Sequence, residues 1–128
     1  MHPNERLLRQ EYKARASSDG ASLADVFADD VVWHVPGRSA ISGVYRGKKQ
    51  VMAYVRRRRR LAGGTFKITV EDVLANDEIG LVIARGSAVL GGKTREWRAH
   101  GFYRFRDGQI AECWVLPEDQ YVFDQIWS

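Results

Sequence analysis

The 128-residue chain has a single cysteine and no long apolar run, and each absence excludes a class of protein. Cys113 has no partner for an intrachain disulfide, and the Cys/His spacings typical of zinc sites are missing. No stretch approaches the roughly 20 apolar residues that a membrane-spanning helix needs. The N-terminal residues, MHPNERLLRQEYK, are charged where a signal peptide would be apolar. We therefore expect a cytoplasmic protein with no membrane partner, no metal and no organic cofactor.

Charge of one sign is in modest excess. The formal net charge is +4, and the five consecutive arginines at 56–60 supply much of it. Such a run can bind nucleic acid, but no second basic patch with interleaved aromatic residues accompanies it. The run continues a helical pattern and is followed by Gly63-Gly64, and arginines in a last turn oppose the negative end of the helix dipole. It predicts a solvent-exposed helix end and no nucleic-acid partner.

The chain reads as helices followed by strands. The spacing of Leu7, Leu8, Glu11, Tyr12 and Arg15 predicts a helix over 3–18. A short helix through Leu23, Val26 and Phe27 to Asp30, a strand over 31–35 and a helix over 47–60 follow. Four strand-like runs at 65–76, 78–90, 94–106 and 109–116 are joined by the turn signals Asn76-Asp77, Gly91-Gly92 and Asp107-Gly108. This order predicts one α+β domain over residues 1–128, an antiparallel meander packed on helices.

Neither face of the predicted meander is simply polar. Alternate residues of a strand point to opposite faces of the sheet, and in the run 78–90 the residues on both faces are largely apolar. We therefore expect neither face to be fully exposed to solvent. One face can cover the helices, while the other mixes aromatic and charged residues and can meet a second subunit. We expect a homodimer through this second face, with the contacts Arg98, His100, Phe102, Glu112 and Trp114.

Several motifs support a more specific fold. They are FADD at 27–30, WHVPG at 33–37, SGVYRG at 42–47, FYRFRDGQI at 102–110 with Glu112 and Trp114, PEDQY at 117–121, and Phe123-Asp124. With the order of elements, they make the chain resemble the nuclear transport factor 2-like superfamily, in particular its SnoaL-like branch, relatives of polyketide cyclases and ketosteroid isomerases. The resemblance implies a cone-shaped, curved antiparallel sheet of the cystatin-like kind, wrapped around N-terminal helices and an apolar pocket. It leaves the reaction open, because one scaffold hosts many functions.

The carboxylates that serve catalysis in these relatives are absent here. The resemblance places a ketosteroid isomerase's base at Val35, its oxyanion acid at Gly101 and its tyrosine at Tyr12, and the cyclases' catalytic aspartate at Val115. The side chains at Val35, Gly101 and Val115 cannot ionise, so a steroid isomerase or an aspartate-dependent cyclase is disfavoured. We expect Val35, Gly101 and Val115 to line the substrate pocket.

Three residues remain as candidate catalytic groups: His34, Tyr12 and Arg85. A histidine can act as a general base near neutral pH, although strict alternation from Val35 points His34 away from the pocket, toward a rim or interface. Tyr12 can donate a hydrogen bond to a ligand oxygen. Arg85 shares a strand face with apolar residues. A buried guanidinium there must pair with ligand oxygens or with an internal carboxylate. The carboxylates considered for it are Asp72, Glu96 and Asp119.

Aromatic residues complete the expected pocket. Trp33, Tyr54 and Trp97 can form walls for a flat or cyclic substrate, with plain core filling as the alternative, and Tyr103 can donate to a ligand. Cys113 is expected at the floor, without a neighbouring base to activate it. Pro36-Gly37 is expected to turn the chain so that a loop carrying Tyr45 covers the entrance.

Together these residues predict a small enzyme acting on an apolar cyclic or polyketide-like molecule, an isomerase, cyclase or dehydratase working by proton transfer. The alternative is a non-catalytic module that binds a small apolar ligand, which the missing carboxylates favour. A protein-binding domain is a third reading without particular support in the sequence.

Overall fold

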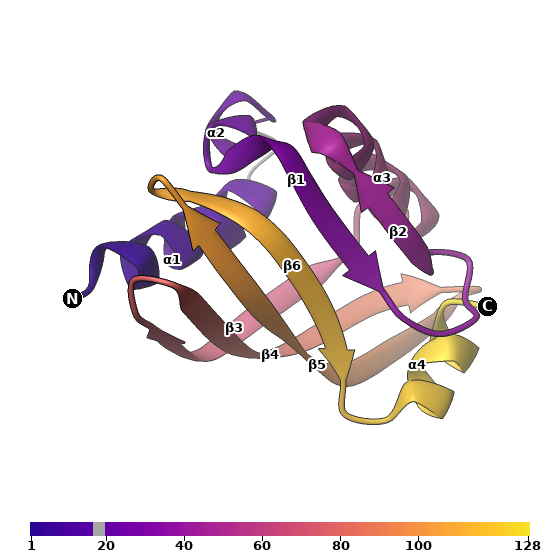
Figure 1. Ribbon diagram of the computed structural model, residues 1–128. Helices are drawn as coiled ribbons and strands as arrows, with labels where there is room; N and C mark the ends of the chain where they lie inside the picture. Colours follow the sequence, from indigo (N-terminus) through magenta and orange to yellow (C-terminus); the bar gives the residue numbers. More distant parts are fainter. Residues whose placement is uncertain (17–19) are drawn as a thin grey trace.

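The computed structural model describes residues 1–16 and 20–128 as an α+β fold, a curved six-stranded sheet with helices packed against one face (Figure 1). The elements are α1 (Pro3–Ala16), α2 (Gly20–Asp25), β1 (Phe27–Val35), β2 (Gly43–Arg46), α3 (Gly47–Leu61), β3 (Lys67–Ala75), β4 (Ile79–Leu90), β5 (Lys93–Arg106), β6 (Gln109–Pro117) and α4 (Gln120–Ile126). The predicted first helix is confirmed as far as Ala16, and its last two positions lie outside the described residues.

The strand order is β2-β1-β6-β5-β4-β3, so the four C-terminal strands form the predicted antiparallel meander. The sheet is not antiparallel throughout, however. Strand β1 lies parallel to β6, with Trp33 opposite Cys113. A parallel pair needs a long crossover connection, and here β2, α3 and the meander separate the two strands along the chain.

Two local predictions near the first strand were wrong. The short helix was expected to reach Asp30, but α2 ends at Asp25 and the residues Phe27 to Asp30 open β1. Pairing with β6 begins at once, since Phe27 is already opposite Ile110. The segment expected as a loop contains β2, whose Tyr45 pairs with Trp33.

The arginine run was only partly predicted. Arg56, Arg57 and Arg60 are exposed, as expected of a solvated helix end. Arg58 is only 5% exposed, so the prediction was wrong there. It follows the buried Val51 and Tyr54 at spacings that keep it on the same face of α3, and that face packs inward.

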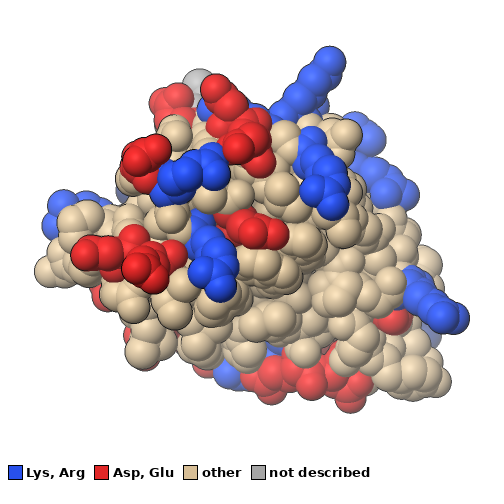
Figure 2. Space-filling model, in the orientation of Figure 1, with Lys and Arg blue, Asp and Glu red and all other residues tan. Residues whose placement is uncertain are grey.

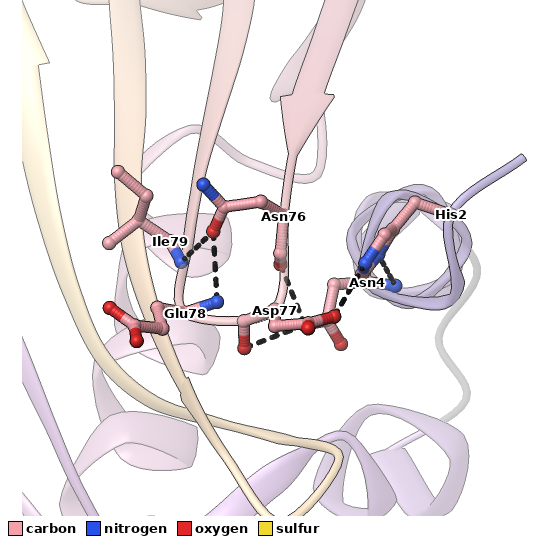
Figure 3. A network of polar contacts seen from close by, with 6 residues as sticks. All are labelled: His2, Asn4, Asn76, Asp77, Glu78 and Ile79. Carbon is pink, nitrogen blue, oxygen red and sulfur yellow. Dashed lines mark hydrogen bonds and ion pairs between the residues drawn. The ribbon is translucent and has the colours of Figure 1, made fainter.

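Figure 3 shows how the start of α1 is attached to the turn between β3 and β4. The Asn4 amide donates to the backbone oxygens of Asn76 at 3.0 Å and Asp77 at 3.3 Å. The Asn76 side chain in turn accepts from the backbone N–H groups of Glu78 and Ile79, which closes the hairpin. These bonds fix α1 against the sheet and so place its inward side chains.

The core lies between the helices and the covered face of the sheet. Its largest fully buried side chains include Leu8, Phe27, Trp33, Ile41 and Tyr103. None of the helices in the described part of the chain is long and apolar enough to cross a membrane.

Candidate functional site

A cavity lies inside the curve of the sheet, between α1, α3 and strands β4 to β6. The centre of a water molecule can move through about 50 Å³ of it, enough for a few water molecules. Much of the lining is aromatic: Tyr12, Trp33, Tyr54, Phe66, Trp97, Tyr103, Phe123 and Trp127. Such a lining suits a flat organic ligand, and one larger than a few water molecules requires side chains to move.

Most of the residues expected in the pocket do line this cavity: Tyr12, Trp33, Tyr54, Trp97, Gly101, Tyr103, Cys113 and Val115. Val35 does not. It is buried in the core at the end of β1, where the strand has passed the cavity, and it borders a groove on the opposite side with His34 and Trp114.

Gly101 occupies the position at which a ketosteroid isomerase has an acid, and the structure gives a packing reason for its size. A Cβ atom there would lie 2.5 Å from the Tyr103 ring. Gly86 stands in the same relation to Trp97, at 2.4 Å. The two glycines let large rings lie flat against the sheet, and these rings form the cavity wall.

A connected polar cluster reaches the cavity from α1. The hydroxyls of Tyr12 and Tyr103 are 2.7 Å apart, and Arg15 Nη2 donates to the Tyr103 hydroxyl at 3.3 Å. Arg15 Nε donates to Glu11 Oε2 at 2.7 Å, and the guanidinium lies 4.0 Å from the centre of the Tyr12 ring. Glu11 therefore holds Arg15, and Arg15 holds the tyrosine pair.

Neither Glu11 nor Arg15 was predicted as a functional residue. The available signal was their position: both share the α1 spacing of Leu8 and Tyr12, so a charged pair sits at core positions of an amphipathic helix. Buried charges are rare unless they are paired, and this pair is four residues apart, one helical turn.

Burial sets the protonation of the cluster. It raises the pKa of Tyr12 to about 12 and that of Tyr103 well above its ordinary value, so both hydroxyls are donors at neutral pH. Desolvation is the largest single influence on the Arg15 pKa and lowers it, but Glu11, Tyr12, Tyr103 and Cys113 together outweigh it and hold that pKa high. Burial raises the pKa of Glu11, with Arg15 and Arg58 opposing. Burial also raises the pKa of the Cys113 thiol, which makes it a poor nucleophile, as its sequence context suggested.

Arg58 enters the cavity from α3. Its Nη1 donates to the Tyr54 hydroxyl at 3.0 Å, and its guanidinium lies 4.1 Å from the centre of the Phe66 ring. The Nε group is buried and has no hydrogen-bond partner in the part of the chain that the structure describes. The same holds for the indole N–H groups of Trp33 and Trp127.

Two of the three expected catalytic side chains point away from the cavity. His34 lies on the opposite face of the sheet, where Nε2 is 2.6 Å from Glu112 Oε2 and the ring stacks on Trp114 with centroids 5.1 Å apart. His34 precedes the Pro36-Gly37 break, and strand alternation holds to the end of β1 at Val35, so the imidazole stays on the outer side.

Arg85 was also placed on the wrong face. It borders the cavity, but its side chain is 56% exposed and its Nε is 3.7 Å from Glu71, a carboxylate that was not among those considered. The neighbouring Ala84 and Gly86 are the residues that face inward. Because both faces of β4 are apolar in sequence, alternation could not choose between them.

His100 was expected at the surface or at a subunit contact, yet its side chain is only 16% exposed and it borders the cavity. The backbone N–H of Ala84 donates to Nδ1 at 3.2 Å, so Nε2 carries the proton and donates to Glu118 at 2.7 Å. Both ring nitrogens are occupied. Hydrogen bonds from Arg98 and then His100 lower the pKa of Glu118.

Tyr45 lies beside Tyr54 of the cavity lining, but on strand β2 rather than in the predicted loop. Its ring centroid is 4.5 Å from that of Tyr54, and its hydroxyl donates to the Ile41 carbonyl at 2.6 Å. Ile41 is itself part of the lining. The segment between β1 and β2 thus closes one side of the cavity.

Comparison with known proteins places this geometry in a family. The family model of the SnoaL-like domain matches residues 8–113. The chain belongs to the SnoaL-like family. An uncharacterised protein of Mycobacterium tuberculosis H37Rv is 35% identical over 124 residues, which cover 95% of this chain and 94% of that protein.

Solved structures share the fold of this chain. Bal32a, from a soil-derived mobile gene cassette, superposes with a TM-score of 0.94 at 31% identity, over 98% of this chain and 97% of that one. An NTF2-like protein of Burkholderia pseudomallei K96243 gives 0.88 at 17% identity, over 100% and 99%. TerC, co-crystallised with polyporic acid, gives 0.85 at 16% identity, over 98% of each chain. The predicted nuclear transport factor 2-like fold is confirmed.

The SnoaL-like cavity has a distinct chemical character. Its buried polar groups are mainly donors: the guanidinium groups of Arg15 and Arg58, tyrosine hydroxyls and indole N–H groups. No carboxylate borders it in residues 1–16 and 20–128. The same residues contain no cluster of three His, Cys, Asp or Glu side chains that could hold a metal ion. The arrangement can bind and polarise an electron-rich oxygen.

Proposed function

We propose that this SnoaL-like protein is an enzyme that acts on an apolar cyclic or polyketide-like molecule by proton transfer, as an isomerase, cyclase or dehydratase. The observation that carries the proposal is the pair of tyrosine hydroxyls, Tyr12 and Tyr103, 2.7 Å apart in a cavity that is otherwise mostly aromatic. A carbonyl oxygen of the substrate accepts a hydrogen bond from this pair. The aromatic walls hold the ring of the substrate in the orientation that the hydroxyls require.

Removing a proton from the carbon next to a carbonyl moves negative charge onto the carbonyl oxygen. Hydrogen bonds to that oxygen strengthen as the charge develops, which lowers the barrier. Tyr12 and Tyr103 suit this role because burial keeps both hydroxyls protonated. Arg15 donates to Tyr103 and adds a positive charge behind it. The proton itself passes to water or to a basic group of the substrate, because the described lining offers no carboxylate and the His100 nitrogens are engaged.

That same shortage of a base favours the second candidate, a non-catalytic module that binds a small organic ligand. Both candidates use the same cavity and the same donors. The structural neighbour TerC was co-crystallised with polyporic acid, which supports a small organic molecule as the occupant in either case.

Deuterium exchange separates the two candidates. The acidic C1 protons of 2-tetralone, an apolar bicyclic ketone, exchange slowly in neutral D2O, and proton NMR follows their loss. We expect the protein to accelerate the exchange and Tyr103→Phe to reduce the acceleration about 100-fold or more, the effect of losing one oxyanion donor. Tyr121→Phe, at a residue that is 73% exposed, should leave the rate unchanged.

Two outcomes would contradict the enzyme. If 2-tetralone binds but exchanges at the buffer rate, the cavity is a binding site only. If neither 2-tetralone nor related cyclic ketones bind, the cavity does not serve this class of molecule.

We also propose that the outer face of the sheet forms a homodimer. Figure 2 shows that the face over the C-terminal ends of β1 and β6 carries few charged side chains. The rings of His34 and Trp114 stack there, Phe102 packs 5.5 Å from Trp114, and Val44 and Leu116 are 48% and 43% exposed. A second copy would cover these apolar groups.

A further inference from the structure

We infer that Arg58 is an anion-binding residue, so that the ligand of the cavity is a ring-bearing organic acid, bound as its anion. The inference rests on the proposed small-molecule function and adds the charge of the ligand to it. It concerns the Arg58 guanidinium, which contacts Tyr54 and Phe66, rather than the tyrosine pair.

The buried charges of the cavity do not balance. Arg15 and Arg58 contribute two guanidinium groups, and each side chain is at most 6% exposed. Glu11 is the one buried carboxylate in the described chain, and its Oε2 is held by Arg15. Among the described residues Arg58 forms no ion pair within 4.0 Å. One buried positive charge is therefore uncompensated, and a buried charge is costly until it is paired.

Several buried donors of the cavity lack a hydrogen-bond acceptor among the described residues. Arg58 Nε, Trp33 Nε1 and Trp127 Nε1 are buried, border the cavity, and have no hydrogen-bond partner among the described residues. Unpaired buried donors are uncommon in folded proteins, and an indole N–H can only donate. A ligand that satisfies these donors must bring acceptor oxygens. Water can satisfy donors too, but it does not neutralise the guanidinium.

Aromatic rings surround the Arg58 guanidinium. Phe66 lies under the Arg58 guanidinium at 4.1 Å, and its ring centroid is 5.9 Å from that of Trp127, which lies 5.5 Å from Trp97. Apolar ring faces therefore adjoin the charge. Benzene-ring acids combine both features, since their ring packs on aromatic walls while the carboxylate pairs with a guanidinium.

Calorimetric titration with benzoate and with benzamide tests the inference, because the two compounds have nearly the same shape and differ in charge. We expect the wild-type protein to bind benzoate about ten- to a hundredfold more tightly than benzamide. Arg58→Gln should abolish this preference. Arg56→Gln removes the same charge from an exposed position of the same helix and should preserve it.

The melting temperature of Arg58→Met adds a second test. A purely structural Arg58 would make this variant melt at a lower temperature, whereas an anion-binding Arg58 would not. Without ligand, Arg58→Met should unfold at the same or a higher temperature than the wild type, because a desolvated charge has been removed. With saturating benzoate, the wild type should gain thermal stability and Arg58→Met should not.

The inference is overturned if wild-type protein binds benzoate no better than benzamide, if Arg58→Gln keeps the preference, or if Arg58→Met is clearly destabilised without ligand. These failures are separable from failure of the proposed function. If the protein catalyses exchange of 2-tetralone but binds benzoate and benzamide equally, the proposed enzyme function is supported and only the anion site is refuted.

Discussion

Glu11 and Arg15 form a buried ion pair one turn apart on α1, with 2.7 Å between Glu11 Oε2 and Arg15 Nε. Their side chains are 0% and 6% exposed. The same helix carries a second Glu–Arg pair with the same spacing, Glu5 and Arg9, whose side chains are 25% and 44% exposed. Two pairs with the same chemistry thus differ in burial, and only the buried one supports the tyrosine hydroxyls.

Glu11→Gln should destabilise the fold by about 3–5 kcal/mol, because it leaves the Arg15 charge buried without a partner. Glu5→Gln should cost less than about 1 kcal/mol, the usual worth of an exposed pair. Urea unfolding measures both. The double change Glu11→Leu with Arg15→Met should recover most of the loss. Equal effects at Glu5 and Glu11 would mean that the buried pair has no special role.

The raised pKa of Tyr12 predicts a loss of stability in alkali. Its folded-state pKa is about 12, against 10.0 for an ordinary tyrosine, so the folded protein retains the proton that the unfolded chain releases. This contribution is complete below pH 10 and is lost as the pH rises through 12, and it amounts to about 3 kcal/mol. Tyr12→Phe should therefore flatten the dependence of unfolding free energy on pH between 10 and 12.

Tyr121→Phe is the control for this titration, because Tyr121 is 73% exposed. It should leave the pH dependence unchanged. An identical slope for wild type and Tyr12→Phe would show that the Tyr12 hydroxyl is in contact with water rather than buried in the cluster.

The proposed dimer predicts a sedimentation result. At micromolar concentration the wild type should sediment as a dimer, and Trp114→Glu as a monomer, because a charge would be buried against the apolar partner surface. Leu61→Glu, at the exposed end of α3, should remain dimeric. A monomeric wild type would refute the interface.

The attachment of α1 in Figure 3 predicts a local effect. Asn4 is 8% exposed and donates to two backbone carbonyls, so Asn4→Ala should cost about 1–3 kcal/mol by leaving them unpaired. His2→Ala should cost less, since it removes one acceptor of the Asn4 N–H and a contact with the Asp77 side chain, which is 96% exposed. Thermal melts of the two variants give the comparison.

The sequence predicted the meander well because its turns and its alternation agreed with each other. Alternation also placed Tyr103 and Gly101 correctly on the cavity face of β5, because only that face carries small residues beside large aromatic rings. It failed at Arg85, where both faces of β4 are apolar and the two registers differ by one residue. Nothing local in the sequence indicates that β1 would pair with β6, because parallel neighbours are joined only through the whole fold.

Arg58 shows a signal that was present and overlooked. It lies four residues after Tyr54 and seven after Val51, the spacing of one helix face, so the inward face of α3 continues into the arginine run. Composition identified a basic run, whereas periodicity separates its one buried member from the exposed ones.

The central claim is that the cavity receives an oxygen of a small cyclic molecule at the Tyr12–Tyr103 pair. A crystal structure of the protein soaked with 2-tetralone tests it directly. We predict density in the cavity, with the carbonyl oxygen within hydrogen-bond distance of the Tyr12 or Tyr103 hydroxyl. Density only in the outer groove near Trp114, or an empty cavity at saturating ligand, would contradict the account.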